Sequence, residues 1–280
     1  MERPVARVDT PEEMFSVRHH ASPCTVEGEP TTPGPHEDPG VQAPRAGQVL
    51  IVVPAFNEEA SIAGTLAQIR EHCPWADAVV IDDGSRDGTA REAAPFGFPV
   101  VRLPFNLGIG GAVQTGFLFA LGKGYAAVVQ VDGDGQHPPG AIAQVAAPVL
   151  AGTADVVVGS RFLPGGAYDQ GFARALGGRI LSRLVSAALR RRLVDTTSGF
   201  RAYSAAVVRH LAEDYPYDYP EPEVLVSLGR RGFRIAEIPV SMHPRRDGVS
   251  SIGLGVSVKY MMKVPLAILL TLLRPRGARA

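Results

Sequence analysis

Two aspartates, Asp132 and Asp134, follow an apolar run in the stretch VVQVDGDGQHPP, which covers residues 128–139. Two carboxylates this close together either raise a pKa or bind a cation that offsets their repulsion. Carboxylate oxygens are ligands that Mg²⁺ prefers, so a divalent metal site is the first candidate. An acidic turn at the end of a strand is the alternative, because Asp and Gly are common turn residues.

The spacing does not continue as a calcium-binding EF-hand loop. Such a loop needs Asp or Asn, Gly and Glu at its fifth, sixth and twelfth positions, where this chain has Gln136, His137 and Ala143. The stretch DGSRDG, residues 83–88, also begins like a calcium loop, but Ala94 stands at its twelfth position. We therefore interpret the second stretch as a turn between a strand and a helix.

The elements that must position these residues are visible as short runs rich in Val and Ile. Near-continuous apolar runs are typical of strands that are buried on both faces of a sheet. Between the first two runs, Ile62, Leu66 and Ile69 recur at helical spacing within residues 58–73, with acidic residues in the first turn. This alternation predicts an α/β fold with a mostly parallel sheet and helices on both faces. The runs cover residues 49–53, 78–82, 99–103, 126–132 and 155–160.

Polar motifs follow four of the five predicted strands. Ligands of such sheets bind beyond the carboxyl ends of the strands, which lie at one edge. A single turn at this edge carries little information, but four that converge there predict a binding site. The motifs are PAFNEE, DDGSRDG, DGDGQH and GSRF, after the first, second, fourth and fifth strands.

The glycine-rich segment NLGIGGAVQTG, residues 106–116, resembles a dinucleotide-binding turn. Val113 stands where the pattern G-x-G-x-x-G/A requires a small residue, and the segment follows the third strand and not the first. We expect instead a close-packed loop that opens a helix.

Length and composition favour one sizeable hydrophobic core, since the chain has 280 residues of which 45% are hydrophobic. Residues 1–47 hold eight prolines and no sustained apolar period, which predicts a disordered leader. The leader lacks the basic start and apolar run of a secretion signal. The two cysteines have no metal-ligand spacing, so a reducing compartment is expected.

The charge of the chain is unevenly distributed although its net charge is zero. Residues 1–170 carry 10 Lys and Arg against 20 Asp and Glu, whereas residues 171–280 carry 18 against 8. Such asymmetry predicts that the second half meets an anionic partner, and a solvated basic face is the alternative. Nucleic acid is not the partner that we expect.

Taken together, the motifs resemble those of family 2 glycosyltransferases, in particular the branch that makes dolichyl- and polyprenyl-phosphate sugars. They occur in the family's order over residues 48–253, and include NLGIGGA, DTTSGFRAY and EIPV…RRDGVSS besides the four above. The resemblance implies a single GT-A domain with a Rossmann-like sheet at 48–253. It leaves a leader at 1–47 and an amphipathic, membrane-associated segment at 254–280.

The resemblance also implies the chemistry: an inverting transfer from a nucleotide-diphosphate sugar, with Mg²⁺ or Mn²⁺. Asp132 and Asp134 match the D-x-D pair that meets the metal and the donor diphosphate. Asp82 matches the carboxylate that binds the base, and Asp83 is the neighbouring candidate. Further positions that match the nucleotide-sugar site are Pro54, Ala55, Glu58, Gly133, Gln136 and Arg245, the last in a loop that closes on the donor phosphates.

The acceptor site that the resemblance implies lies in the basic half. Arg161 and Arg174 match arginines that bind the acceptor phosphate, and a guanidinium group suits phosphate oxygens. Asp195 and Glu223 match further family positions. A lipid phosphate is already ionised and needs no strong base, whereas a sugar hydroxyl would need one, for which Glu223 or Asp195 are candidates. A surface ion pair is the alternative reading of Arg174 and Glu223.

Two departures from the family pattern bear on the acceptor. Ser251 stands where the family often has Lys, and Gly178 stands where a small hydroxylated residue is common. The expected function is nevertheless sugar transfer to polyprenyl phosphate in cell-envelope glycan synthesis. The alternatives are transfer to a hydroxyl of a growing glycan, and a non-catalytic nucleotide-binding partner of a membrane protein.

Membrane contact is expected at the inner face of the cytoplasmic membrane, without a spanning helix. The last apolar stretch, residues 264–273, is too short to span a bilayer, which needs about 20 residues. Residues 173–192 and 258–274 instead have the pattern of basic amphipathic helices, which can lie on an anionic surface. Packing against the protein core is the alternative for both segments.

Overall fold

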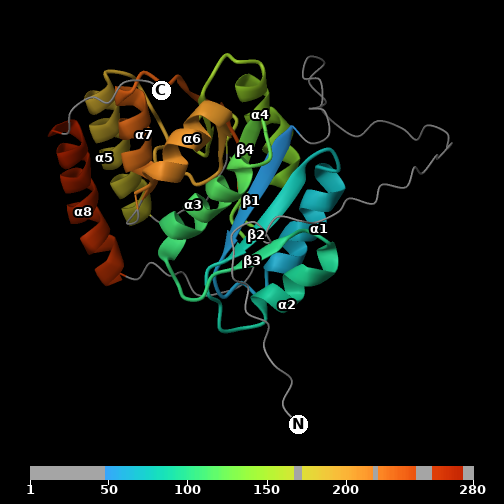
Figure 1. The fold of residues 1–280 in the computed structure, drawn as a ribbon. Helices are drawn as coiled ribbons and strands as arrows, with labels where there is room; N and C mark the ends of the chain where they lie inside the picture. Colours follow the sequence, from blue (N-terminus) through green and yellow to red (C-terminus); the bar gives the residue numbers. More distant parts are fainter. Residues whose placement is uncertain (1–47, 167–171, 217–219, 244–253, 274–280) are drawn as a thin grey trace, which may run out of the picture. The chain divides into compact units, whose positions relative to one another are not determined.

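The computed structural model describes residues 48–166, 172–216, 220–243 and 254–273 (Figure 1). The predicted leader, residues 1–47, and Arg245 and Ser251, which lie in 244–253, are outside the described residues. Among the described residues, no helix combines the length and the apolar character that are needed to cross a membrane.

The centre of the fold is a seven-stranded sheet with the order β3-β2-β1-β4-β6-β5-β7. β6 runs antiparallel to both of its neighbours, and the other neighbouring strands pair in parallel, which confirms the predicted mostly parallel sheet. The five predicted strands are all present. The strands are β1 (Val49–Ala55), β2 (Asp77–Asp82), β3 (Val100–Arg102), β4 (Ala127–Gln130), β5 (Val156–Ser160), β6 (Arg201–Ser204) and β7 (Ile235–Pro239).

Helices cover both faces of this sheet (Figure 1). Side chains alternate along a strand, so Leu50 and Val52 of β1 pack with α3 while Val49, Ile51 and Val53 pack with α1 and α4. The helices are α1 (Ile62–His72), α2 (Thr89–Ala93), α3 (Gly108–Leu121), α4 (Ile142–Leu150), α5 (Phe172–Leu189), α6 (Ala205–Glu213), α7 (Pro220–Arg230) and α8 (Leu254–Leu273).

The first helix begins later than the sequence pattern predicted. Glu58 and Glu59 precede α1, so its first turn has no acidic residue, and that part of the prediction was wrong. The backbone of this segment is held from outside the helix, because Glu58 N donates a hydrogen bond of 2.8 Å to Thr89 Oγ1. Ser61 Oγ also donates to Glu58 Oε2, at 2.7 Å. The two glutamates therefore lie in the loop that follows β1.

The glycine-rich segment opens a helix, as predicted, because α3 begins at Gly108 within it. Gly108 has a φ of 82°, a conformation that residues with a side chain rarely adopt. A Cβ atom at Gly116 would overlap the side chain of Val52, so a glycine is required for α3 to lie this close to β1.

The basic amphipathic helices predicted near 173–192 and 258–274 form α5 and α8, and each buries one face. Leu181 and Val185 of α5 and Val264 and Ile268 of α8 belong to the core. α8 packs on α7 and α5. Core packing therefore accounts for one face of each helix, and leaves the opposite face exposed.

We expect the thiol of Cys73 to be unreactive in the folded protein. Cys73 follows α1, is 2% exposed, and donates a weak hydrogen bond to the carbonyl of Pro139. Burial raises the pKa of this thiol to about 12, and the thiolate is the reactive form. In a Cys24→Ser variant, Ellman's reagent at neutral pH should label Cys73 only after unfolding in guanidinium. Rapid labelling of the native variant would show that the end of α1 is not packed as described.

Candidate functional site

The ends of three parallel strands bring the predicted donor-site motifs together. β1 pairs with β2 so that Ala55 lies opposite Asp82. Two backbone hydrogen bonds tie the following loops to β1: Asp83 N donates to the carbonyl of Ala55 at 2.9 Å, and Gly133 N to that of Pro54 at 3.1 Å. The motifs after β1, β2 and β4 therefore form one continuous edge.

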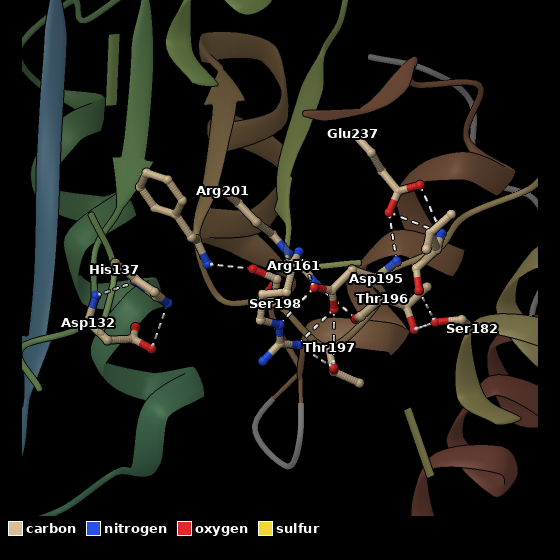
Figure 2. Close-up of polar contacts among 12 residues, drawn as sticks. Asp132, His137, Arg161, Ser182, Asp195, Thr196, Thr197, Ser198, Arg201 and Glu237 are labelled. Carbon is tan, nitrogen blue, oxygen red and sulfur yellow. Dashed lines mark hydrogen bonds and ion pairs between the residues drawn. The ribbon is translucent and has the colours of Figure 1, made fainter. Parts of the chain in front are cut away.

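The turn that carries Asp132 and Asp134 is organised by a histidine to which the sequence analysis assigned no role. His137 Nδ1 accepts a hydrogen bond of 3.0 Å from the backbone N–H of Asp132, and His137 Nε2 lies 3.6 Å from Asp132 Oδ2 (Figure 2). Burial lowers the pKa of His137 to about 4, although the Asp134 carboxylate acts in the opposite direction. The imidazole is therefore neutral, and the lone pair on its Nδ1 accepts the hydrogen bond from Asp132 N that holds the turn.

The two aspartates offer oxygen atoms of the kind that Mg²⁺ and Mn²⁺ bind. The Asp132 side chain is 33% exposed, and Asp134 Oδ1 accepts a hydrogen bond from Gln136 N at 3.0 Å. A Cβ atom at position 199 would lie 3.2 Å from Asp132 Oδ2, so Gly199 leaves space beside this carboxylate.

The described residues contain no group of three or more His, Cys, Asp or Glu side chains that could hold a metal ion by themselves. Magnesium is commonly bound by one or two carboxylates together with substrate phosphates. The residues present therefore fit a cation that is shared with a diphosphate, and they do not form a complete cage.

Asp82 and Asp83, the two candidates for binding the base, have different surroundings. Asp82 is fully buried; its Oδ1 accepts a hydrogen bond from Ser85 N at 2.9 Å, whereas its Oδ2 has no hydrogen bond and lies 3.3 Å from Arg102 Nε. The Asp83 carboxylate accepts hydrogen bonds from the backbone of Leu107 and Gly108, at 2.7 and 2.9 Å. Asp83 thus anchors the loop before α3, and burial raises its pKa.

A cavity of about 530 Å³ lies beside this pair of aspartates, and the sequence analysis did not identify its walls. Ser85 and Arg102, which both contact Asp82, line it. Phe56 and Phe105 also line it, and they are 42% and 64% exposed. Two exposed aromatic rings beside a buried carboxylate suit a flat heterocycle.

Arg161 and Asp195, which the sequence placed in separate motifs, form a bidentate ion pair (Figure 2). Arg161 Nε and Nη2 donate to the two carboxylate oxygens, each at 2.8 Å, and Arg161 N adds a third hydrogen bond of 2.9 Å. Nη2 also donates to Thr197 Oγ1 at 2.7 Å. The Asp195 side chain is fully buried and that of Arg161 is 14% exposed, so the guanidinium orientation is set by the protein.

Glu237 supports this ion pair from β7 (Figure 2). Its carboxylate accepts hydrogen bonds from the backbone N–H groups of Val194 and Asp195, at 2.8 and 2.7 Å. From the other side, Ser182 Oγ of α5 donates to the carbonyl of Val194 at 2.9 Å. The motif EIPV contains Glu237, but only the structure reveals what its side chain contacts.

The remaining predicted residues are not all brought to this site. Glu223 Oε1 accepts a hydrogen bond of 3.1 Å from Thr271 Oγ1, which places the side chain at the contact between α7 and α8. Arg174 lies on α5, but its side chain is outside the described residues, and so is Arg245. The predicted contacts of Arg174 with the acceptor phosphate and of Arg245 with the donor phosphates therefore stay predictions.

Comparison with known proteins agrees with this architecture. Glucosyl-3-phosphoglycerate synthase from Mycobacterium tuberculosis has a solved structure that is 23% identical, with a TM-score of 0.64, and the match covers 82% of this chain and 80% of that one. This similarity shows a shared GT-A-like fold.

Curated relatives match over most of their length. Undecaprenyl-phosphate mannosyltransferase of Micrococcus luteus is 32% identical over 234 residues, which are 78% of this chain and 92% of that protein. Polyprenol monophosphomannose synthase of Mycolicibacterium smegmatis is 31% identical over 242 residues, 82% and 89% of the two chains. Residues 50–212 match the model of the family described as glycosyl transferase family 2. The chain belongs to glycosyl transferase family 2 and is a glycosyltransferase.

Proposed function

We propose that the protein transfers a sugar from a nucleotide-diphosphate sugar to polyprenyl phosphate, with inversion at the anomeric carbon and with Mg²⁺ or Mn²⁺. The observation that carries this proposal is the similarity to two polyprenyl-phosphate mannosyltransferases over most of their length. The family match, which covers residues 50–212, includes the polar motifs after β1, β2, β4 and β5.

On the donor side, the carboxylate oxygens of Asp132 and Asp134 are the proposed ligands of the cation, and Gln136 is a proposed contact of the nucleotide sugar. When bound, the cation supplies positive charge that stabilises the leaving diphosphate. A bound cation also offsets the repulsion between the two carboxylates. The solved glucosyl-3-phosphoglycerate synthase was crystallised with Mn²⁺ and UDP, which supports this assignment. Pro54, Ala55, Glu58 and Gly133 are proposed to line the donor site, together with Arg245.

The cavity beside Asp82 is the proposed site of the base. A base in this cavity would stack on the exposed rings of Phe56 or Phe105. Asp82 Oδ2, a buried oxygen without a hydrogen bond next to the lining residue Arg102, is the proposed acceptor of a ring N–H. Uracil and guanine carry such an N–H, whereas cytosine and adenine present a lone pair at the corresponding ring atom. The chemistry therefore favours a uridine or guanosine nucleotide.

On the acceptor side, the engaged carboxylates favour a phosphate over a hydroxyl. A hydroxyl acceptor needs a base, but Asp195 is paired with Arg161 and Glu223 accepts a hydrogen bond from Thr271. A phosphate oxygen is already ionised, so orientation and charge neutralisation are sufficient. Arg161, held by Asp195, is proposed to orient the acceptor phosphate with Arg174.

We place the transferase domain at residues 48–253 and expect the protein to act peripherally at the inner face of the cytoplasmic membrane. The basic second half of the chain supports this location. The segment 254–280 is proposed to contribute membrane contact.

The proposed transfer can be tested directly. Purified protein with Mn²⁺, a panel of radiolabelled UDP- and GDP-sugars and detergent-solubilised polyprenyl phosphate should move label into the organic phase, and EDTA should prevent it. A nucleotide diphosphate that is released only when a glycan acceptor is added, with no label in the organic phase, would contradict the lipid-phosphate acceptor.

Replacing Asp134 should remove activity without unfolding the protein. Asp134→Ala loses one proposed metal ligand, so we expect turnover to fall by roughly a thousandfold or more. The circular dichroism spectrum and the thermal unfolding midpoint should stay near those of the parent. Asp214→Ala, at an exposed position after α6, is the matched control and should keep full activity. Full activity of Asp134→Ala would exclude this metal site.

The buried ion pair should matter for stability. Asp195→Asn leaves the Arg161 guanidinium without its charged partner, which costs about 3 kcal/mol of unfolding free energy for a buried pair. Urea denaturation measures this change. Glu92→Gln removes an exposed partner of Arg91 and should leave the midpoint unchanged. An equal midpoint for both variants would show that the pair is not buried in solution.

A further inference from the structure

An exposed apolar face runs along α8. The buried residues Val264, Ile268 and Thr271 lie on one side of this helix. The opposite side presents four leucines at a spacing of three, four and seven residues, which places them on one face. We call this set the leucine face: Leu266, Leu269, Leu270 and Leu273, which are 55%, 52%, 52% and 72% exposed.

The packing of α8 fixes which side faces outward. α8 packs on α7 and α5, as Figure 1 shows, and Thr271 Oγ1 donates a hydrogen bond to Glu223 of α7. The helix therefore cannot turn its leucines inward without losing these contacts. A contiguous exposed apolar surface on a folded domain is typical of a site that contacts a protein partner or a membrane.

A basic groove lies on α5, which is adjacent to α8. The groove has a volume of about 570 Å³, and five arginines of α5 and the residues after it line it. None of these arginines has a carboxylate of a described residue within 4.0 Å. We call this site the arginine groove: Arg179, Arg183, Arg190, Arg191 and Arg192.

The two chain segments that form these features carry positive charge only. Two acids that contact them from other elements, Glu237 and Glu223, already accept hydrogen bonds from Val194 N and Thr271 Oγ1. Residues 171–194 and 248–280 contain no Asp or Glu. The negative end of a helix dipole accounts for cations after the last turn of α5, but its effect does not reach Arg179 and Arg183, which lie further back in the helix. The mutual repulsion of the arginines therefore favours an anionic partner.

We propose that the arginine groove and the leucine face form a docking surface for an anionic lipid bilayer. Leucine side chains enter the boundary between head groups and acyl chains, and guanidinium groups bind lipid phosphates. Exposed leucines alone would also suit a protein partner, but the five arginines on and after the neighbouring helix α5, which have no carboxylate of a described residue within 4.0 Å, match a surface of phosphates. The inference rests on the proposed function in that a lipid-linked acceptor would reach the enzyme from such a bilayer.

The groove connects to the proposed acceptor site through a short segment. Leu193 and Val194 line the groove, and the next residue, Asp195, pairs with Arg161. Ser186 Oγ accepts a hydrogen bond of 2.9 Å from Leu193 N, which binds this segment to α5. A bilayer on the docking surface would therefore lie next to the arginine that is proposed to orient the acceptor.

The test of the arginine groove uses the full chain and sedimentation with vesicles. Equimolar phosphatidylglycerol and phosphatidylcholine provide an anionic surface, and phosphatidylcholine alone provides a neutral one. We expect binding to the anionic vesicles that weakens at high salt. Arg179→Gln with Arg183→Gln should reduce the partition coefficient about tenfold or more. Arg209→Gln, at an exposed arginine of α6, is the matched control and should have little effect.

The leucine face has its own pair of variants. Leu269→Ser with Leu270→Ser should reduce vesicle binding about tenfold, because it removes two apolar side chains from the membrane contact. Leu118→Ser with Leu121→Ser, on α3, changes two leucines that are 54% and 42% exposed and should leave binding unchanged. Circular dichroism and thermal unfolding of all four variants separate lost binding from lost folding.

Three outcomes would overturn the proposal: no binding of the parent chain to anionic vesicles, equal binding to neutral vesicles, or equal losses in the control variants. Sedimentation velocity adds a fourth, since a dimer that Leu269→Ser with Leu270→Ser dissociates would identify the leucine face as a contact between two copies. Vesicle binding needs no nucleotide sugar. A chain that binds vesicles but transfers no sugar would therefore refute the proposed function and retain the docking surface.

Discussion

The parallel pairing of β1 with both β2 and β4 is the constraint on which the candidate site depends. Because the three strands point the same way, the loops that follow them begin at one edge. Asp82 at the end of β2 and Asp132 just after β4 therefore lie on either side of the end of β1, although fifty residues separate them in the chain. α3 keeps this edge compact, since Gly116 allows it to approach β1 closely. The like-charged residues at the edge are tolerated because each has a backbone or side-chain donor nearby, and they are suited to binding a cation and a ligand.

The other half of the site depends on a relay of buried polar contacts. Glu237 holds the backbone at Asp195, and Asp195 in turn holds the guanidinium of Arg161 (Figure 2). Removal of one partner is costly because it leaves the other charge buried and unpaired, but the intact pair adds little net stability, so its main contribution is orientation. It gives the flexible Arg161 side chain a single direction, as the proposed transfer to an ionised phosphate would require.

α5 and α8 are amphipathic helices whose two faces have different surroundings, the protein core on one side and the solvent-exposed surface on the other. Each helix buries a narrow apolar stripe in the core and still presents apolar and basic side chains on the opposite side. A soluble helix normally has a polar outer face. The exposed leucines of α8 and the arginines of α5 are therefore best explained by contact with a second surface outside the protein, which we propose to be an anionic bilayer.

The sequence by itself determined the α/β fold, the five Val- and Ile-rich strands and the edge at which the polar motifs meet, because apolar periodicity and the alternation of strands with helices are local patterns along the chain. It did not predict β6 and β7, whose short runs RAYS and IAEIP mix polar and apolar residues and acquire their strand form from their neighbours in the sheet. Only the tertiary structure decided that His137 closes the aspartate turn, that Asp195 pairs with Arg161 and that Glu223 faces α8. These contacts join residues whose spacing along the chain carries no period, so no local pattern could reveal them.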